Sequence, residues 1–478
     1  MPSPRVRVHV APGAPVLAGL AAVRAELGVP PEFPAEVIAA AEEAASRAPG
    51  AEHRDATDLP FVTVDPAGSS DLDQAFHASR SGDGWVVDYA IADVGWFVRP
   101  GDLLDREARR RGVTLYSPDL RTPLYPATLS EGAASLLPDV DRPALLWRID
   151  VGPEGLVRSF DLSRAVVRSR EQLTYDGAQR EIDGGQARES LALLREVGAA
   201  LLSAEAARGG VHLPIPEQEV EPDGAGWALR LRAPLPVEDW NAQVSLVTGR
   251  CAAQAMLDAR LGVLRTLPAP VRKSVDALRR SSHALDVPWA DDQAYPDWVR
   301  SLDPADGRHM ALAALAARLL RGAGYLAFVD SSPDPAAALH AAIAAPYAHV
   351  TAPLRRLADR YANEVVLAAL AGSRAGDDVV DALPLLPDLM NDAGRRQNAL
   401  ERAAVDFVEA AVLSAHVGEE FDATVVDLDR DAGRGAVQLA APAVRAPVEG
   451  AGLVLGTRLR VRLEVADPVS RTVRFRTA

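Results

Sequence analysis

Apolar residues recur at helical spacing in the first 50 residues of the chain. Two Ala-rich segments, 15–28 and 34–48, each begin with proline and carry apolar residues three or four positions apart. Proline is favoured in the first turn of a helix, because the N–H group that it lacks has no partner there in any case. The pattern predicts a small helical module over residues 1–57, with two short helices in a helix-turn-helix-like arrangement.

The pattern changes at about residue 58, where short apolar runs begin to alternate with helical segments. The runs at 61–64, 85–94 and 144–151 are rich in β-branched and aromatic residues, which is typical of strands. Helical spacing is found at 103–112, 189–209, 240–265, 308–325, 353–372 and 395–416. The mixture predicts one large α+β domain over residues 58–415.

Short strand-like runs return after residue 416. Four or five of them in the last 60 or so residues predict a small β-barrel of the OB type over residues 416–478. In one run, arginine alternates with apolar residues, so that Arg458, Arg460 and Arg462 share one face of a strand. This face either follows the backbone of an RNA strand or is an ordinary solvated surface.

The composition is that of a soluble globular protein, with 48% hydrophobic and 24% charged residues. The net charge of −15 argues against a protein whose whole surface binds nucleic acid, although it permits a local basic groove. No apolar run is long enough to cross a membrane, and the first residues lack the pattern of a signal peptide. A single cysteine, Cys251, excludes an internal disulfide framework. We therefore expect a cytoplasmic monomer that has no membrane partner.

Three aspartates lie close together in the segment FVTVDPAGSSDLDQAF, residues 61–76. Asp65 ends an apolar run, and Asp71 and Asp73 follow a short loop in a segment without lysine or arginine. Carboxylates held together raise one another's pKa unless a cation neutralises them. Mg²⁺ suits carboxylate oxygens and completes its shell with water and phosphate. The segment predicts a magnesium site or, alternatively, a solvated acidic turn.

Five segments resemble, in order, the RNB catalytic domain of the RNase II family. The acidic segment resembles the opening of that domain. The family's Tyr-x-Pro-Asp run, its Leu-Thr-Tyr segment, its Arg-Arg segment and its Glu-Arg helix are matched by residues 109–138, 167–178, 344–361 and 399–407. The matches cover most of residues 58–415, and the predicted barrel stands where the family carries an S1 domain.

The resemblance implies a processive 3′-to-5′ exoribonuclease that hydrolyses single-stranded RNA to nucleoside 5′-monophosphates. The implied cofactor is Mg²⁺, with Mn²⁺ as a substitute. Asp65, Asp71 and Asp73 match the first three of four family aspartates at the scissile phosphate, and Asp71 and Asp73 are expected to be catalytic. The fourth position, usually Asp, is Gln74, which offers an oxygen to a cation or its water but brings no charge.

The resemblance also implies residues that bind RNA. Arg355 matches the arginine that clamps the phosphate next to the cleavage point, so it is expected to be catalytic, and Arg356 follows it. Tyr116 matches a tyrosine that holds the 3′-terminal nucleotide, and Tyr175 matches another that lines the RNA channel. The alternative for each tyrosine is an ordinary core aromatic, and the alternative for Arg356 is a solvated helix pair with Asp359.

Two other functions are compatible with the sequence. The first is RNA binding without catalysis by an altered RNB domain, which is possible because Gln74 replaces a family aspartate. The second is a deoxyribonuclease or a polymerase-like enzyme with two metals, because such enzymes also use clustered carboxylates. Typical family members begin with cold-shock β-barrels, whereas this sequence begins with helical segments. We therefore expect RNA that carries a single-stranded 3′ tail beside a duplex to be a substrate as well.

Overall fold

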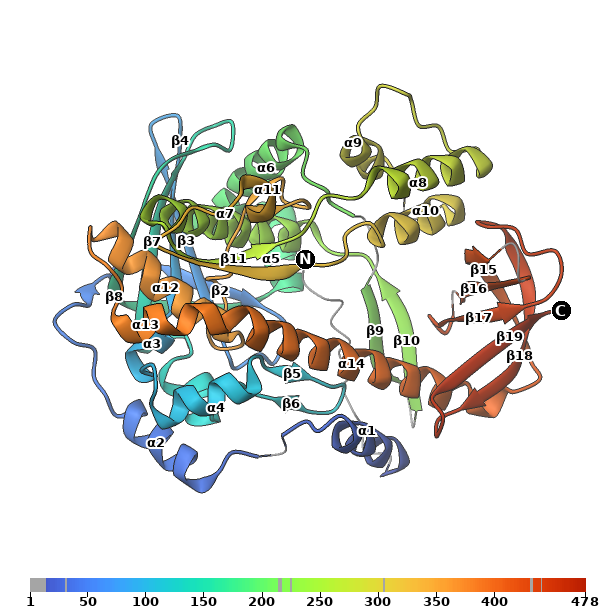
Figure 1. The fold of residues 1–478 in the computed structure, drawn as a ribbon, viewed down its shortest axis with the longest axis horizontal. Helices are drawn as coiled ribbons and strands as arrows, with labels where there is room; N and C mark the ends of the chain where they lie inside the picture. The colour runs from blue at the N-terminus through green and yellow to red at the C-terminus, as the bar shows by residue number, and fades with distance from the viewer. Residues whose placement is uncertain are drawn as a thin grey trace.

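The computed structural model describes residues 14–30, 32–213, 217–223, 226–303, 306–429, 433–439 and 441–478. For residues 14–15, 217–223 and 226–231 it describes the backbone alone. A large α+β body occupies one side of the molecule, and a small β-barrel forms the other end, where the chain terminates (Figure 1). The predicted fold class, an α+β domain followed by a C-terminal barrel, is confirmed.

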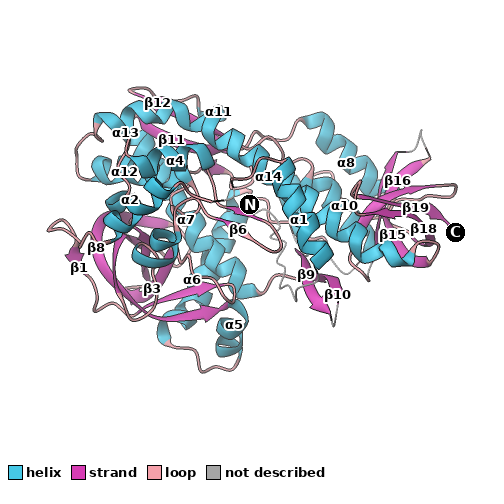
Figure 2. Ribbon diagram, turned by 90° about the horizontal axis from the view of Figure 1, so that it is seen from below, coloured by secondary structure: helices cyan, strands magenta, loops and turns pink. Residues whose placement is uncertain are grey.

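A six-stranded sheet with the order β1-β8-β2-β3-β4-β7 forms the first part of the body. The sheet closes on itself because β8 is 18 residues long: its first part pairs antiparallel with β7, and its end runs parallel to β2. Figure 2 shows the curvature that results. The strands are β1 (Arg54–Asp55), β2 (Phe61–Asp65), β3 (Gln74–Ser81), β4 (Gly84–Ala92), β7 (Asp141–Val151) and β8 (Val157–Thr174).

Helices cover this sheet and extend the body. α6 packs on β3 and α7, and α12 packs on α7, β8 and β11. The helices of this region are α3 (Val94–Phe97), α4 (Leu103–Arg111), α5 (Tyr175–Asp183), α6 (Glu189–Arg208), α7 (Pro236–Ala259), α8 (Arg272–Ala284), α9 (Tyr295–Arg300), α10 (Gly307–Ala317), α11 (Pro335–Ala338), α12 (Leu357–Leu370) and α13 (Asp377–Ala382), with the π-helix η1 (Thr128–Ala133) and the 3-10 helix η2 (Leu383–Leu385).

For two helices, the end that the sequence predicted was wrong. The helix expected at 240–265 ends as α7, because Arg260 adopts a left-handed φ of 53° and the chain then enters β11 (Leu261–Thr266). β11 pairs antiparallel with β12 (Gly324–Val329), so the helix expected at 308–325 also ends early, as α10. Apolar spacing alone does not separate a short buried strand from the end of a helix. The remaining short strands are β5 (Leu115–Tyr116), β6 (Arg121–Thr122), β9 (Glu217–Asp223), β10 (Gly226–Arg232), β13 (Leu339–His340) and β14 (Ala345–Pro346).

The two predicted N-terminal helices exist as α1 (Ala14–Glu26) and α2 (Ala35–Ala45), and both dock on the body. α1 packs on the long helix α14 (Leu386–Leu413) so closely that a Cβ at Gly19 would lie 2.0 Å from the Phe407 ring. The Arg111 guanidinium lies 3.7 Å from the centre of the Phe33 ring between the helices. Apolar side chains of both helices therefore belong to the same hydrophobic core as the RNB-like body.

The C-terminal strands form the closed barrel β15-β16-β17-β19-β18, and β18 pairs with β15 to complete it. α14 reaches from the body to this barrel (Figure 1), where it packs on β18 and β19. Apolar residues of β18 and β19 point inward and their arginines are exposed, as the period of two predicts. The elements are η3 (Ser414–His416), β15 (Glu420–Asp429), β16 (Arg434–Leu439), β17 (Arg445–Glu449), β18 (Arg458–Asp467) and β19 (Thr472–Thr477).

Candidate active site

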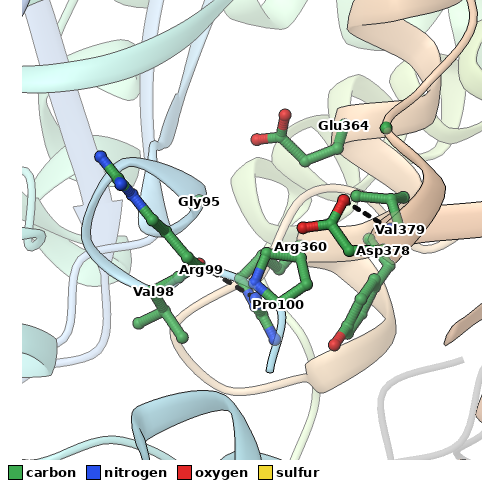
Figure 3. Close-up of a pocket in the computed structure, with 10 residues that line it drawn as sticks. Gly95, Val98, Arg99, Pro100, Arg360, Glu364, Asp378 and Val379 are labelled. Carbon is green, nitrogen blue, oxygen red and sulfur yellow. Dashed lines mark hydrogen bonds between the residues drawn. The ribbon is translucent and has the colours of Figure 1, made fainter. Parts of the chain in front are cut away.

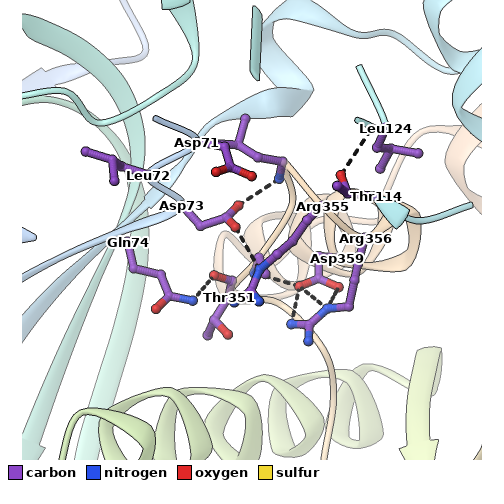
Figure 4. A network of polar contacts seen from close by, with 12 residues as sticks. Asp71, Leu72, Asp73, Gln74, Thr114, Leu124, Thr351, Arg355, Arg356 and Asp359 are labelled. Carbon is purple, nitrogen blue, oxygen red and sulfur yellow. Dashed lines mark hydrogen bonds and ion pairs between the residues drawn. The ribbon is translucent and has the colours of Figure 1, made fainter. Parts of the chain in front are cut away.

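The loop between β2 and β3 carries the acidic residues, and the side chain of Ser135 fixes its course. Ser135 Oγ donates to the carbonyl oxygen of Ser70 at 2.7 Å and accepts from the Leu72 N–H at 2.9 Å. Leu72 is fully buried. The side chains on either side of it, Asp71 and Asp73, lie on the side of the loop that faces Arg355 (Figure 4). The loop is therefore held in one conformation with two carboxylates turned to the same side.

Asp73 joins this loop to a segment 281 and 282 residues further along the chain. One carboxylate oxygen accepts from the Leu354 N–H at 2.8 Å, and the other accepts from Arg355 Nε at 3.0 Å (Figure 4). The Asp73 side chain is only 6% exposed. Burial raises the pKa of Asp73 well above its ordinary value, the charge of Asp71 raises it further, and the Leu354 N–H opposes both. A cation near Asp71 and Asp73 would relieve this repulsion.

The Arg355 segment is a tight turn before α12. The N–H of Arg355 donates to the carbonyl of Ala352 at 3.1 Å, and the carbonyl of Arg355 accepts from Thr114 N–H at 2.9 Å. Asp359, fully buried in the first turn of α12, accepts from the Ala352 N–H at 2.7 Å and pairs with Arg356 at 2.8 Å. Burial alone would lower the pKa of Arg356, but the Asp359 carboxylate raises it above its ordinary value. Arg356 and Asp359 are thus an ordered, largely buried pair, and the solvated helix pair is ruled out.

Gln74 lies at the start of β3, and its side-chain amide is held at both ends. Its Nε2 donates to the carbonyl of Thr351 at 2.5 Å, and its Oε1 accepts from the Tyr89 hydroxyl at 2.7 Å. Burial raises the pKa of Tyr89, and Tyr175, Asp65 and Asp73 add to the shift because all three are close enough to act on the hydroxyl. Tyr89 thus marks the place where Asp65, Asp73, Gln74 and Tyr175 converge.

Tyr116 reaches the site through a two-stranded hairpin. It lies on β5, directly opposite Arg121 on β6, and its side chain is partly exposed. Arg121 forms ion pairs with Asp71 and with Glu131 of η1. The hairpin that carries Tyr116 is therefore tied to the acidic loop. The structure brings together all of the predicted residues of the body, from four separate segments of the chain.

Two family models match this chain. The RNB domain matches residues 53–372, and the RNase II-type exonuclease C-terminal S1 domain matches residues 419–478. The first match covers more than half of the chain. The chain belongs to the RNB family. The acidic loop, the Arg355 turn and the Tyr116 hairpin all lie within the matched RNB domain, and the arginine-bearing strands lie within the matched S1 domain.

Named relatives of this RNB protein are ribonucleases. It is 24% identical over 442 residues to Ribonuclease R 1 of Lactococcus lactis subsp. lactis (strain IL1403), covering 85% of this chain and 52% of the relative. It is 29% identical over 378 residues to the exosome complex exonuclease RRP44 of Homo sapiens, covering 73% and 38%. The chain therefore spans about half of the first relative and less of the second.

Solved structures show the same fold. The apo form of Mycoplasma genitalium RNase R matches with a TM-score of 0.85 at 20% identity, over 97% of this chain and 78% of that chain. The same protein in complex with double-stranded RNA matches with a TM-score of 0.82 at 21% identity, over 97% and 83%. Yeast Ssd1, described as a pseudonuclease, matches with a TM-score of 0.69 at 16% identity, over 89% and 53%.

The chemistry of Asp71 and Asp73 is compatible with a divalent cation that also takes phosphate oxygens as ligands. Among the described residues, no three His, Cys, Asp or Glu side chains form a ready-made metal cage. Asp71 and Asp73 are nevertheless close enough for the first to raise the pKa of the second. Mg²⁺ is usually held by one or two carboxylates together with phosphate oxygens, so this pair suffices. The magnesium set of Asp65, Asp71, Asp73 and Gln74 stays a prediction, and the Gln74 oxygen already accepts the Tyr89 hydroxyl.

The exposed arginines of the barrel face acidic neighbours across the strands. Arg462 Nη2 lies 3.1 Å from Glu420 on β15, and Arg460 Nη2 lies 3.5 Å from the other oxygen of that carboxylate. On the same face, Glu464 pairs with Arg476 at 2.5 Å. The role of Arg458, Arg460 and Arg462 in RNA binding stays a prediction, and the net positive charge of the face is smaller than the arginines alone indicate.

A separate cavity of about 270 Å³ lies beside α12 (Figure 3). Arg360 and Glu364 of α12 line it, and their charges are already paired. Arg360 pairs with Asp105 and donates to the Val98 carbonyl at 3.0 Å, whereas Glu364 accepts from Arg164 at 2.5 Å. These buried pairs fix α12 against α4 and β8. They therefore position the Arg355 turn that precedes α12, and the cavity contains none of the predicted site residues.

Sequence reasoning missed Arg121, Tyr89 and Thr351. Arg121 could have been found from the sequence, because it is the only basic residue between Arg111 and Arg142. An isolated arginine in a segment that resembles part of a nuclease domain is a candidate partner for a carboxylate or a phosphate. Tyr89 acts through its place on a neighbouring strand, and Thr351 acts through its carbonyl oxygen, so their residue types carried no signal.

Proposed function

We propose that this RNB protein is a processive 3′-to-5′ exoribonuclease that hydrolyses RNA to nucleoside 5′-monophosphates with Mg²⁺ as cofactor and Mn²⁺ as a substitute. One observation carries the proposal: the buried Asp73 carboxylate meets Arg355 directly, beside Asp71. Asp73 is a carboxylate, the type of group that binds Mg²⁺, and Arg355 is a guanidinium, the type of group that binds phosphate. The two groups are in direct contact. Membership of the RNB family supports the reaction class.

In this proposal each group of residues has a distinct task. When bound, the cation would lower the pKa of a water molecule and offset charge on the phosphate. Asp71 and Asp73 provide the negative charge that attracts it. Asp73 holds Arg355 through Nε at 3.0 Å, and the Nη groups would contact a phosphate placed next to Asp73. Arg356 is fixed by Asp359 and adds positive charge beside it.

The proposed substrate is single-stranded RNA that enters with its 3′ end. Tyr116 and Tyr175 offer aromatic faces on which any base can stack, as a general degrading enzyme needs. Two solved relatives' structures contain RNA: Mycoplasma genitalium RNase R is in complex with ribose methylated single-stranded RNA in one and with double-stranded RNA in the other. We include structured RNA with a single-stranded 3′ tail among the proposed substrates, and we propose a cytoplasmic, monomeric enzyme. Among the described helices none is both long and apolar enough to cross a membrane.

A second candidate function is RNA binding without hydrolysis. Gln74 favours it, because the amide stands where most of the family has a fourth aspartate and is committed to Thr351 and Tyr89. The fold is compatible with it as well, since a pseudonuclease shares the architecture. Asp71, Asp73 and Arg355 favour hydrolysis, because a protein that only binds RNA gains nothing from buried carboxylates that repel phosphate.

The decisive experiment incubates 5′-labelled RNA and DNA oligomers with the purified protein, in Mg²⁺ and in EDTA. We expect stepwise shortening of RNA from the 3′ end in Mg²⁺, release of nucleoside 5′-monophosphates, and no reaction in EDTA or with DNA. RNA that is bound but not shortened would support the non-catalytic alternative. Equal shortening of DNA would support a deoxyribonuclease.

A further inference from the structure

Arg121 ties the acidic loop to two neighbouring elements. Its Nη1 pairs with Asp71 and its Nη2 pairs with Glu131. Nη2 also donates to Ser70 Oγ at 3.3 Å, and Ser70 Oγ donates to the second oxygen of Glu131 at 2.9 Å. The side chains of Arg121 and Asp71 are 23% and 13% exposed. Water screens such a pair less than it screens a pair on the open surface, so the arginine neutralises a substantial part of the Asp71 charge.

Arg121 also lies beside the place proposed for the end of the RNA. It is the cross-strand partner of Tyr116, which is proposed to hold the 3′-terminal nucleotide. One guanidinium therefore lies between a proposed nucleotide contact and a proposed cation ligand. A guanidinium has five N–H donors in a planar fork, and it pairs with phosphate as well as with carboxylate.

We propose that Arg121 is an exchangeable counter-ion of Asp71. Without RNA it neutralises Asp71 and competes with the cation for that carboxylate. When RNA is bound, a phosphate near Tyr116 pairs with Arg121 and leaves Asp71 to the cation. The inference rests on the proposed function, because it requires Asp71 to hold the cation.

The exchange predicts that cation and RNA strengthen each other's binding. Whatever RNA does to the affinity for the cation, the cation must do to the affinity for RNA, because both share one thermodynamic cycle. The cation site is then weak in the free protein and is completed when a substrate phosphate is in place. Arg121 is a positioning residue in this scheme, since it acts on the cation through Asp71.

The test measures cation binding and RNA binding separately, so that it does not depend on hydrolysis. Electron paramagnetic resonance gives the affinity for Mn²⁺ without RNA, and fluorescence anisotropy gives the affinity for a labelled RNA oligomer in EDTA. In Arg121→Gln we expect Mn²⁺ to bind at least about fivefold more tightly, the lower end of the range for coupled sites. RNA in EDTA should bind at least about fivefold more weakly, because the phosphate loses its partner and meets the bare Asp71 charge.

Two further variants complete the test. Arg121→Lys keeps one charge but cannot bridge two carboxylates with a planar fork, so both affinities should fall between those of Arg121→Gln and the unchanged protein. Arg158→Gln is the matched control, because Arg158 forms an exposed ion pair with Asp83 at 2.7 Å in another part of the sheet. It should change neither affinity. If Arg121→Gln does not fold, as judged by circular dichroism, Arg121→Lys decides. It should bind Mn²⁺ more tightly, and RNA in EDTA more weakly, than the unchanged protein does.

Unchanged Mn²⁺ affinity in Arg121→Gln would overturn the inference, because the arginine would then not compete with the cation. Weaker Mn²⁺ binding would overturn it too, since Arg121 would then help to build the cation site. The unchanged protein is assayed in parallel for Mn²⁺-dependent RNA hydrolysis. Hydrolysis together with either of these results leaves the proposed function standing and removes only the role of Arg121. The absence of hydrolysis with any cation removes the proposed function, and the inference with it.

Discussion

Replacing Asp73 by asparagine should stop hydrolysis and leave the cation-free fold at least as stable as before. The Asp73 carboxylate is 6% exposed and close to Asp71, so burial and repulsion raise its pKa above the ordinary value. A carboxyl whose pKa is raised by folding stabilises the fold while it is protonated, and this stabilisation is lost as the pH rises through the folded-state pKa. Above the unfolded-state pKa, this carboxyl therefore weakens the cation-free fold. Asparagine removes the charge and still accepts from the Leu354 N–H.

The expected size follows from the contacts of Asp73. Each tenfold rise in proton affinity corresponds to about 1.4 kcal/mol. Against this gain stands the lost ion pair with Arg355, worth about 0–1 kcal/mol because that arginine is 27% exposed and water can solvate it. We expect Asp73→Asn to gain between about 0 and 2 kcal/mol in EDTA at pH 8. The gain should vanish below about pH 4, where the wild-type carboxyl is protonated in both states.

Thermal unfolding in EDTA at several pH values measures this effect, and single-turnover digestion of labelled RNA in Mg²⁺ measures the chemistry. Hydrolysis should fall by about 10³-fold, which corresponds to about 4 kcal/mol of transition-state stabilisation. RNA binding in EDTA should be unchanged or tighter, because one charge that repels phosphate is gone. Asp88→Asn is the control, since Asp88 pairs with the half-exposed Arg148 at 3.1 Å on the face of β4 opposite to Tyr89. It should lower the unfolding midpoint only slightly and spare hydrolysis.

Two results would refute this reasoning. Turnover of Asp73→Asn comparable to that of the wild type would remove Asp73 from the chemistry. A midpoint in EDTA at pH 8 clearly below that of the wild type would show that the ion pair with Arg355 stabilises the fold by more than burial of the charge weakens it.

Three other substitutions test neighbouring features. Gln74→Asp removes the donor to the Thr351 carbonyl and should destabilise the cation-free fold by about 1–3 kcal/mol in urea unfolding, with Mg²⁺ restoring part of the loss; a loss that Mg²⁺ does not change would place residue 74 away from the cation. Glu420→Gln releases Arg462, its closest partner at 3.1 Å, and should tighten RNA binding and steepen its dependence on salt by up to about 0.7 per released contact, whereas an unchanged slope would mean that this face does not touch RNA. Tyr116→Ala should raise KM for short RNA oligomers by an amount that corresponds to about 1–3 kcal/mol of lost stacking, and an unchanged KM would make it a core aromatic.

Much of the architecture follows from local pattern. The helices at 103–111 and 189–208, three of the six strands of the first sheet (β2, β4 and β7) and the alternation in β18 were predicted, because helical and strand periods leave different spacings of apolar residues. Prediction failed where a backbone conformation decided the outcome. Arg260 ends α7 with a left-handed φ, and the apolar residues after it pair with β12. Nothing in the local spacing distinguishes these residues from another helical turn.

The residues of the candidate site were also named from the sequence, because carboxylates, arginines and tyrosines in family-like order indicate their chemistry before their positions are known. The tertiary structure alone decided which of them meet. It placed Asp73 against Arg355 across 282 residues, turned Gln74 toward Tyr89 and Thr351, and gave Asp71 an arginine partner that the resemblance did not include. The reason is physical: a charge buried by the fold needs a partner within a few ångströms, and the packing of distant segments determines which side chain is there.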